Sequence, residues 1–309
     1  MTEILTGFGS VALIIAVGWL VGRSGVLGKN GGITLNMVVF WVAMPCMLVH
    51  TLATSDTSAV FGLPFYVAAG SALTVAIFYL LIAAPLLKQR GADAVVGAMS
   101  SSYNNVANLG IPIAIAVLHD ATSVVPALIF QIAFYAPFCL TILDVLTSSQ
   151  GSLNLGRSLL SPLKNPIFLS AIIGLTINAT GVTLPTMVET PVSLLGQAAV
   201  PMALLAFGVS LHGMPFLRNG VSPRRAVAVS SFAKNIGQPA AAWLIASQLF
   251  GMSGHTLLSA VVIAALPTAQ NVYTFSTRYG RNTIQARDSG VVTTLACVPV
   301  VVVIALLLG

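Results

Sequence analysis

Apolar segments alternate with short polar loops along the whole chain. Ten of these segments approach the length of about 20 apolar residues that a helix needs to cross the hydrocarbon core of a bilayer. They occupy residues 4–22, 33–53, 63–87, 92–118, 122–146, 165–180, 187–211, 223–250, 255–277 and 287–308. The pattern predicts an all-α polytopic membrane protein with ten transmembrane helices.

The composition supports a membrane setting. Of the 309 residues 57% are hydrophobic and only 6% are charged, whereas a soluble domain carries about 25% charged residues. The net charge of +6 does not indicate a nucleic-acid partner, because the basic residues lie in short loops between apolar segments. The three cysteines are scattered inside apolar segments, so we interpret them as packing residues and predict no metal site and no cofactor.

The basic residues lie on one side of the predicted topology. Twelve of the thirteen fall between an odd-numbered span and the next even-numbered one: Arg23, Lys29, Lys88, Arg90, Arg157, Lys164, Arg218, Arg224, Arg225, Arg278, Arg281 and Arg287. Loops rich in Lys and Arg stay in the cytoplasm. The sequence therefore predicts a multi-pass protein of the cell (inner) membrane with both termini outside.

Two of the predicted spans contain helix-breaking residues. The fourth holds Ser101–Pro112, a polar stretch with Gly110 near its end, and the ninth holds Leu266–Asn271 with Pro267. Proline lacks a backbone N–H and breaks or kinks a helix. At membrane depth, broken backbone is tolerated where it is buried in protein or lines a cavity. Both spans are therefore predicted to be discontinuous and to form a binding site, the alternative being proline-kinked packing helices.

The two halves of the chain resemble each other. Three pairs of identical residues lie 156 positions apart, namely Gly18 and Gly174, Gly25 and Gly181, and Val26 and Val182. Pro112 and Pro267 lie 155 apart. Because five spans per copy is an odd number, the second copy enters the membrane from the opposite face. Residues 1–155 and 156–309 are thus predicted to be inverted five-helix repeats, the design of secondary transporters whose broken helices meet at the substrate site.

Three sequence motifs resemble those of the auxin efflux carrier family. Asn105–Pro112 is similar to the family pattern Asn-x-Gly-x-x-Gly-x-Pro, although Ala107 stands where the pattern usually has glycine. Leu266–Asn271 resembles the second break of the family, and Lys234 with Pro239 matches its Lys-x-x-x-x-Pro pattern. The resemblance covers essentially the whole chain.

The resemblance implies an architecture and a mechanism. The fourth and ninth spans would cross at their breaks, in a fold shared with bile acid/sodium symporters and sodium/proton antiporters. Spans 1, 2, 6 and 7 would form a scaffold, and spans 3–5 and 8–10 a transport domain that moves as an elevator. The short link at residues 147–164 is similar to that of bacterial members. Family members are often homodimers and carry small carboxylates such as auxin, malate or malonate.

The candidate site residues lie at the two breaks. We expect substrate to be bound by amide side chains, namely Asn104, Asn105, Asn108, Gln270 and Asn271. The expected crossing is made by Gly110, Pro112 and Pro267. Freed N–H groups and the positive end of a half-helix attract an anion, and Asn105 matches the family position that would bind a carboxylate. The alternative is that these amides only satisfy the broken backbone.

Lys234 is the thirteenth basic residue and lies within the eighth span. It follows Arg225 by nine residues, about 14 Å along a helix, which exceeds what a lysine side chain can span to reach the headgroups. A charge at that depth costs about 2.5–3.5 kcal/mol on insertion scales, so it needs protein or water around it. Two interpretations stay open: Lys234 acts as a built-in cation that stabilises the crossed helices, or it releases a proton during transport.

Together these features predict a secondary active transporter of a small organic anion that uses an elevator mechanism. One alternative is a cation/proton antiporter of the same architecture, disfavoured because no acidic residue lies near the middle of spans four, eight or nine. Another is a membrane receptor that transports nothing. An enzyme is not expected, since no nucleophile–base arrangement or nucleotide loop is present. The expected partners are the carboxylate, the lipid bilayer, a coupled proton or sodium ion and a second copy of the chain. The substrate, the direction of transport and the coupling ion are left open.

Overall fold

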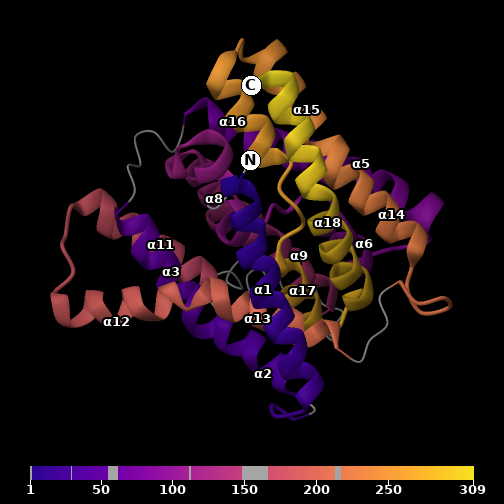
Figure 1. Ribbon diagram of the computed structural model, residues 1–309, viewed down its shortest axis with the longest axis horizontal. Helices are drawn as coiled ribbons and strands as arrows, with labels where there is room; N and C mark the ends of the chain where they lie inside the picture. The colour runs from indigo at the N-terminus through magenta and orange to yellow at the C-terminus, as the bar shows by residue number, and fades with distance from the viewer. Residues whose placement is uncertain (1, 29, 55–61, 111–112, 148–165, 213–216) are drawn as a thin grey trace. The chain divides into compact units, whose positions relative to one another are not determined.

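A computed structural model describes residues 2–28, 30–54, 62–110, 113–147, 166–212 and 217–309 (Figure 1). Within these ranges the regular structure is helical, apart from one isolated antiparallel bridge between Asn104 and Thr268. The described part of the chain is therefore all-helical, as the series of long apolar segments predicts, and is consistent with a polytopic membrane protein.

The chain divides into two compact units, and each takes residues from both halves of the sequence. The first unit contains residues 1–11, 60–131 and 216–309, and the second contains residues 12–59 and 132–215. The division into repeats at residue 155 and the assignment of spans to a scaffold and a transport domain stay predictions.

The first unit contains the two predicted breaks. Its helices are α5 (Leu63–Leu87), α6 (Ala92–Ser102), η2 (Val106–Gly110), η3 (Ala114–Leu118), η4 (Ala121–Val124), α8 (Val125–Ile129), α14 (Arg224–Phe232), η7 (Ala233–Gly237), α15 (Gln238–Leu244), η8 (Ile245–Leu249), α16 (Gly254–Ala264), α17 (Gln270–Tyr279) and α18 (Thr283–Leu308). The η segments are π-helical, except for η4, which is a 3₁₀ turn. Helix α18, yellow in Figure 1, packs against α14 and α17.

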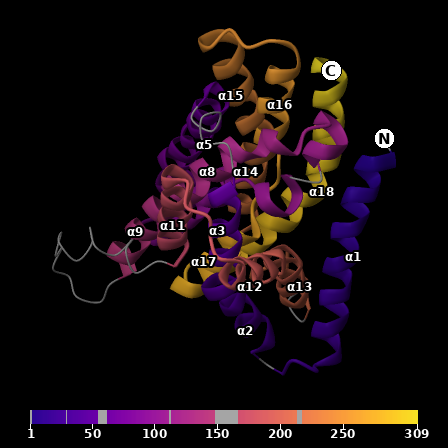
Figure 2. The same ribbon diagram turned by 90° about the vertical axis from the view of Figure 1, so that its left-hand side faces the viewer.

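The second unit contains most of α1 and the helices near the middle of the chain. Its helices are α1 (Thr2–Ser24), α2 (Gly31–Val38), η1 (Val39–Ala43), α3 (Met44–Thr54), α9 (Ala136–Thr147), α11 (Pro166–Thr180), α12 (Thr186–Gln197) and α13 (Ala199–Leu211). The π-helical segment η5 (Phe130–Tyr135) joins the two units along the chain. Helix α3 packs against α11 and α12, and α2 packs against α13 (Figure 2).

Two glycines of the second unit permit close helix contacts that are related by the repeat. A Cβ at Gly18 of α1 would collide with the backbone of Leu205 and lie 3.0 Å from Cα of Gly208 in α13. A Cβ at Gly174 of α11 would lie 2.8 Å from Cβ of Leu52 in α3. Gly174 follows Gly18 by 156 residues, and Gly208 follows Leu52 by the same number. The recurrence of glycine in the sequence thus coincides with a recurrence of close packing.

Five helices are long and apolar enough to cross a membrane by length and composition. They are Gly31–Thr54, Leu63–Leu87, Val125–Thr147, Thr186–Val209 and Thr283–Leu308. Each of the other predicted ranges also contains helix, but the fourth and ninth are interrupted and the eighth carries Lys234 and Gln238 among its apolar residues. The count of ten crossings is therefore not confirmed.

One basic residue lies elsewhere than the loop pattern implies. The sequence pattern places Arg287 with the loop charges that precede the tenth span, but the structure places it inside α18, where only 3% of it is exposed. The helix begins at Thr283, so Arg287 is more than one turn from its start. Its partner is the next residue, Asp288, which explains how a charge is retained there.

Candidate functional site

The two breaks lie side by side and pair as short antiparallel segments. The backbone N–H of Asn105 donates to the carbonyl of Pro267 at 2.8 Å, and that of Ala269 donates to the carbonyl of Tyr103 at 2.9 Å. Backbone groups that leave a helix need new partners where no water is available. Each break supplies them to the other, so the interruptions in the fourth and ninth predicted spans form one structural element.

Gly110 allows the two breaks to approach closely. A Cβ at Gly110 would lie 3.0 Å from Cδ1 of Leu266 and 3.3 Å from Cγ1 of Val106. A side chain at this position would therefore press on the second break. The glycine of the first motif thus has a packing role at the crossing.

The outer edge of the first break is held by a glutamine. The backbone N–H of Asn104 donates to Oε1 of Gln131 at 2.5 Å, and Nε2 of Gln131 donates back to the carbonyl of Asn104 at 2.9 Å. Gln131 is buried at the start of η5. Its amide acts as a third peptide group beside the paired backbones, so that the backbone N–H and the backbone carbonyl of Asn104 both have a partner.

The outer edge of the second break is held by a threonine. The backbone N–H of Thr268 donates to Oγ1 of Thr293 in α18 at 3.0 Å, and Oγ1 of Thr268 donates to the carbonyl of Ser100 in α6 at 2.5 Å. Both threonines are buried. Neither Gln131 nor Thr293 is among the site residues that the sequence predicts. The signal for each is a polar residue within an apolar segment, but its partner lies far away in the chain.

We expect Gln131→Leu to destabilise the protein, because it leaves two buried backbone groups of Asn104 without partners. Each such group costs about 1–3 kcal/mol, so the midpoint of thermal unfolding in detergent should fall by several degrees. Gln248→Leu removes the same type of side chain from an exposed position in η8 and should leave the midpoint unchanged. Equal midpoints for the two variants would show that the Gln131 contacts do not stabilise the break.

Lys234 is fully buried and binds the end of the half-helix that precedes the second break. Its Nζ donates to the carbonyl of Ala264, the last residue of α16, at 2.9 Å. In a continuous helix this carbonyl would accept from the N–H of Thr268, four residues on, but that N–H is bound to Thr293. The ammonium therefore replaces a lost helical donor at the negative end of the helix dipole. It is carried by the π-helical segment η7, and such segments are frequent at functional sites.

Lys234 has a carbonyl partner and no carboxylate partner in the part of the chain that the structure describes, where the one ion pair is that of Arg287 and Asp288. An ammonium whose described acceptor is a neutral carbonyl has no counter-ion to compensate its charge. An anionic ligand near it would supply one.

Several buried amide atoms in this unit have no partner among the described residues. They include Oδ1 of Asn104, Nδ2 of Asn105, Oε1 of Gln270 and both amide atoms of Gln238. Gln238 follows Lys234 by one helical turn and is also fully buried. Buried polar atoms are almost always hydrogen-bonded, so these donors and acceptors indicate that water or a polar ligand completes the site.

Of the remaining predicted site residues, the structure describes Asn271 fully, Asn108 in part and Pro112 not at all. Asn271 lies in the first turn of α17 and is partly exposed. That turn follows the extended residue Ala269 and contains no acidic side chain, so its positive end is free to attract an anion. Asn108 lies in η2, but its side chain is outside the described residues, as is the whole of Pro112.

A second polar feature, missed in the sequence, is an ion pair inside α18. Nε and Nη2 of Arg287 donate to Oδ1 of Asp288 at 2.8 and 2.6 Å. Asp288 has no exposed surface, and its Oδ2 and the Nη1 of Arg287 lack partners among the described residues. The pair precedes Thr293 by five residues, about 7.5 Å along the helix. It brings a buried carboxylate into the unit that contains the crossing.

Comparison with known proteins identifies the family. The family model described as "Membrane transport protein" matches residues 5–305. A protein of Rhizobium meliloti (strain 1021) named "Putative malonate transporter" is 25% identical over 278 residues, which cover 86% of this chain and 84% of the relative. An "Uncharacterized transporter" of Methanothermobacter thermautotrophicus is 27% identical over 269 residues, covering 84% and 83%. The chain therefore belongs to the membrane transport protein family, which is the auxin efflux carrier family that its two helix breaks resemble.

Proposed function

We propose that the protein is a secondary active transporter of a small organic anion, which binds beside the paired breaks. The observation that carries the proposal is the fully buried ammonium of Lys234, bound to the second break and without a carboxylate partner among the described residues. Asn105 at the first break and Gln238, one helical turn after Lys234, hold amide donors without partners among the described residues. A fixed cation together with free N–H donors suits a carboxylate.

The charge of the site argues for an anion and against a metal cation. A buried charge is costly unless it is paired, so a bound carboxylate would lower the free energy of a site that contains Lys234. A sodium ion at the same place would add a second positive charge. Lys234 thus supplies the positive charge that a bound cation would otherwise provide.

A small dicarboxylate is the first substrate to test. One relative is named "Putative malonate transporter", and malate and auxin-like carboxylates are the other candidates of the family. Purified protein should be reconstituted into proteoliposomes and its uptake of labelled malonate, malate and an indole carboxylate measured with and without gradients of protons or sodium ions. Saturable uptake of one carboxylate above that of empty liposomes is the expected result. Uptake of none of them under any gradient would contradict the proposal.

We expect Asn105→Ala to weaken substrate binding by about ten- to a hundredfold. The variant removes an amide donor that has no partner in the described part of the chain, and a hydrogen bond to a charged group contributes about 1.5–3 kcal/mol. Binding of the transported carboxylate to the purified protein, measured by calorimetry, checks the value. Asn219→Ala, in the exposed segment before α14, is the matched control. An unchanged affinity in Asn105→Ala would exclude this residue from the site.

The mechanism we propose is elevator-type alternating access, with a transport domain built from spans 3–5 and 8–10 and a scaffold built from spans 1, 2, 6 and 7. Asn105 and Asn271 would face one cavity, and the protein would act as a homodimer. The paired breaks support this proposal because they bind each other, Lys234 and Gln131 within one unit. A unit that holds the site through its own contacts is able to move without losing the substrate.

We expect both termini to lie on the outer side of the cell membrane, since the basic loops are predicted to lie on the cytoplasmic side. Cysteines introduced as Arg157→Cys and Glu189→Cys should then react with an impermeant thiol reagent from opposite sides. Labelling in intact and in opened spheroplasts distinguishes the two sides. Reaction of both positions from the same side would contradict the predicted order of spans.

A cation/proton antiporter is the second candidate, and Asp288 is the observation that favours it. This carboxylate is fully buried, and ionisable acids inside membrane proteins often mark ion pathways and proton relays. One observation counts against this candidate. The guanidinium of Arg287 binds Asp288 and so fills the position that a transported cation would need beside this carboxylate. Uptake of labelled sodium driven by a proton gradient, without any carboxylate, would establish the antiporter instead.

A further inference from the structure

Helix α17, the second half of the ninth predicted span, has a polar face. Of its six non-aromatic polar residues, all but Ser276 lie within an arc of about 120°, because a helix advances about 100° per residue. These residues, which we call the polar face, are Gln270, Asn271, Thr274, Thr277 and Arg278. The opposite side of the helix carries Val272 and Phe275, which are buried. The polar face thus runs along α17 from the second break to the predicted cytoplasmic end of the span.

The protein around α17 does not satisfy this face in full. Near the break, Gln270 and Thr274 are only 7% and 6% exposed, whereas Thr277 and Arg278, at the other end, are partly exposed. Oε1 of Gln270 and Oγ1 of Thr277 have no partner among the described residues. At membrane depth a polar group without a partner is costly unless water reaches it. The polar face therefore indicates water beside α17, extending from the partly exposed end towards the break.

Arg278 places a positive charge at the partly exposed end of the polar face. It lies in the last turn of α17, eight residues or about 12 Å along the helix from Gln270, and its Cζ is 5.5 Å from the centroid of the Tyr279 ring. Helix α17 contains no acidic residue. Asp288 of the neighbouring α18 is bound to Arg287, so that pair adds no net charge. A cationic group at the end of a narrow path raises the local concentration of anions.

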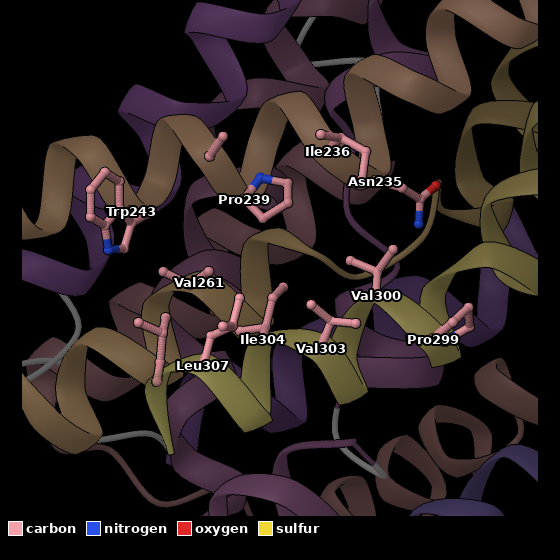
Figure 3. Close-up of a pocket in the computed structure, with 12 residues that line it drawn as sticks. Asn235, Ile236, Pro239, Trp243, Val261, Pro299, Val300, Val303, Ile304 and Leu307 are labelled. Atoms are coloured by element: carbon pink, nitrogen blue, oxygen red, sulfur yellow. The ribbon is translucent and has the colours of Figure 1, made fainter.

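An apolar groove of the same unit does not suit an anion. The groove has a volume of about 500 Å³ and lies between α15 and the second half of α18 (Figure 3). Its lining residues are apolar or aromatic except for Asn235 at one end. An ionised carboxylate that leaves water for such surroundings loses its hydration without replacement. Of the two features, only the polar face of α17 offers an anion polar partners and a positive charge.

We propose that the polar face of α17 lines a water-filled path between the cytoplasm and the paired breaks, and that Arg278 at its open end selects anions. The occupants of the path are water and the transported anion, which passes from the guanidinium of Arg278 to the amides of Gln270 and Asn271. The direction to the cytoplasm follows the predicted topology, in which the loop after α17 is basic. The selection of anions rests on the proposed function for the identity of the substrate, whereas the presence of water beside α17 does not.

The path is tested by the reaction of introduced cysteines with a thiol reagent that reacts only in water. The background carries Cys46→Ala and keeps Cys139 and Cys297, which are buried. Into it either Thr277→Cys or Asn271→Cys is introduced, at positions of the polar face that are partly exposed. The purified protein in lipid nanodiscs, which are open to water on both sides, is treated with a methanethiosulfonate that carries a sulfonate group. We expect both cysteines to react well above the rate of the background.

The control is Leu295→Cys in α18. Leu295 is 70% exposed, but its helix is long and apolar enough to cross a membrane, so an exposed apolar side chain there faces lipid. We therefore expect no reaction at this position. Reaction at Leu295→Cys as fast as at the two positions of α17, or no reaction at either of those two, would overturn the path.

Selection by Arg278 is tested with a second reagent, in which a trimethylammonium group replaces the sulfonate. The ratio of the anionic to the cationic rate at Asn271→Cys reports the potential in the path, because a change in the reactivity of the thiol itself cancels. Arg278→Gln should lower this ratio by roughly threefold to tenfold. Arg281→Gln removes the same charge from an exposed residue just beyond the helix and should leave the ratio within about twofold.

Equal ratios in Arg278→Gln and Arg281→Gln would overturn selection by Arg278. Both variants keep the cysteine at position 271 and are compared with the same background, so a general loss of folding would appear as a change in both rates and not in their ratio. No substrate is present in these measurements. They are therefore decided separately from the uptake of carboxylates that tests the proposed function.

Discussion

Replacing Lys234 with Met should reduce carboxylate uptake by about ten- to a hundredfold while the protein still inserts and purifies. Met keeps most of the volume of the side chain and removes its charge, so the change tests electrostatics more than packing. It removes the donor to the carbonyl of Ala264 and the fixed cation that would pair with the substrate. Hydrogen bonds that involve a charged group contribute about 1.5–3 kcal/mol, and about 1.4 kcal/mol corresponds to a tenfold change.

The control is Lys88→Met, which removes the same charge from an exposed residue after α5. Uptake by Lys88→Met should equal that of the wild type. The two interpretations of Lys234 are separated by counterflow, in which labelled substrate exchanges for unlabelled substrate without a gradient. A built-in cation is needed for both exchange and gradient-driven uptake, whereas a proton carrier is needed mainly for the latter. Wild-type uptake in Lys234→Met would exclude both roles.

The sequence predicted the two breaks because the physical constraint on them is local. Proline has no N–H to donate, and lipid offers no replacement partner, so Pro267 implies an interruption wherever the span lies. The polar run before Gly110 implies the other interruption in the same way. The structure contains both and pairs their backbones through Asn105 and Ala269. The prediction that the two breaks meet came from the inverted repeat. Local helix propensity alone would not predict that contact.

The partners of the breaks were not predictable from local patterns. Gln131 is 27 residues from the residue that it holds, and Thr293 is 25 residues from Thr268. A single polar residue in an apolar span indicates that some partner exists but does not identify it. Lys234 was singled out because a lysine at that depth requires an explanation, yet its acceptor, the carbonyl of Ala264, is a backbone atom and has no sequence signature.

The ion pair of α18 was missed for a different reason. The apolar pattern predicts that the tenth span begins at Arg287, whereas the helix begins at Thr283. The shift of one turn places Arg287 inside the protein, whereas the loop pattern places it at the surface. The carboxylate beside it, Asp288, has no exposed surface and is not part of the sequence prediction. Helix ends are the least certain part of such a prediction, and here the uncertainty concealed the buried carboxylate.

We expect Asp288→Asn to lower the midpoint of thermal unfolding by roughly 10 °C, because it leaves the buried guanidinium of Arg287 without its counter-ion. Breaking one side of a buried ion pair costs about 3–5 kcal/mol. Replacing both partners by apolar residues of similar size is often neutral. The double variant Arg287→Met with Asp288→Leu should therefore recover most of the lost stability, as measured by thermal unfolding in the same detergent.

The double variant also shows what the pair contributes to transport. If Asp288 carries the coupled proton, the recovered protein should exchange labelled for unlabelled carboxylate but should lose uptake driven by a proton gradient. If the pair is structural, both activities should return with stability. Asp120→Asn, in a partly exposed loop before η4, is the control for loss of a carboxylate and should change neither stability nor coupling. A wild-type midpoint in Asp288→Asn would mean that Arg287 has water or another counter-ion beside it, and the pair would then be no candidate for proton coupling.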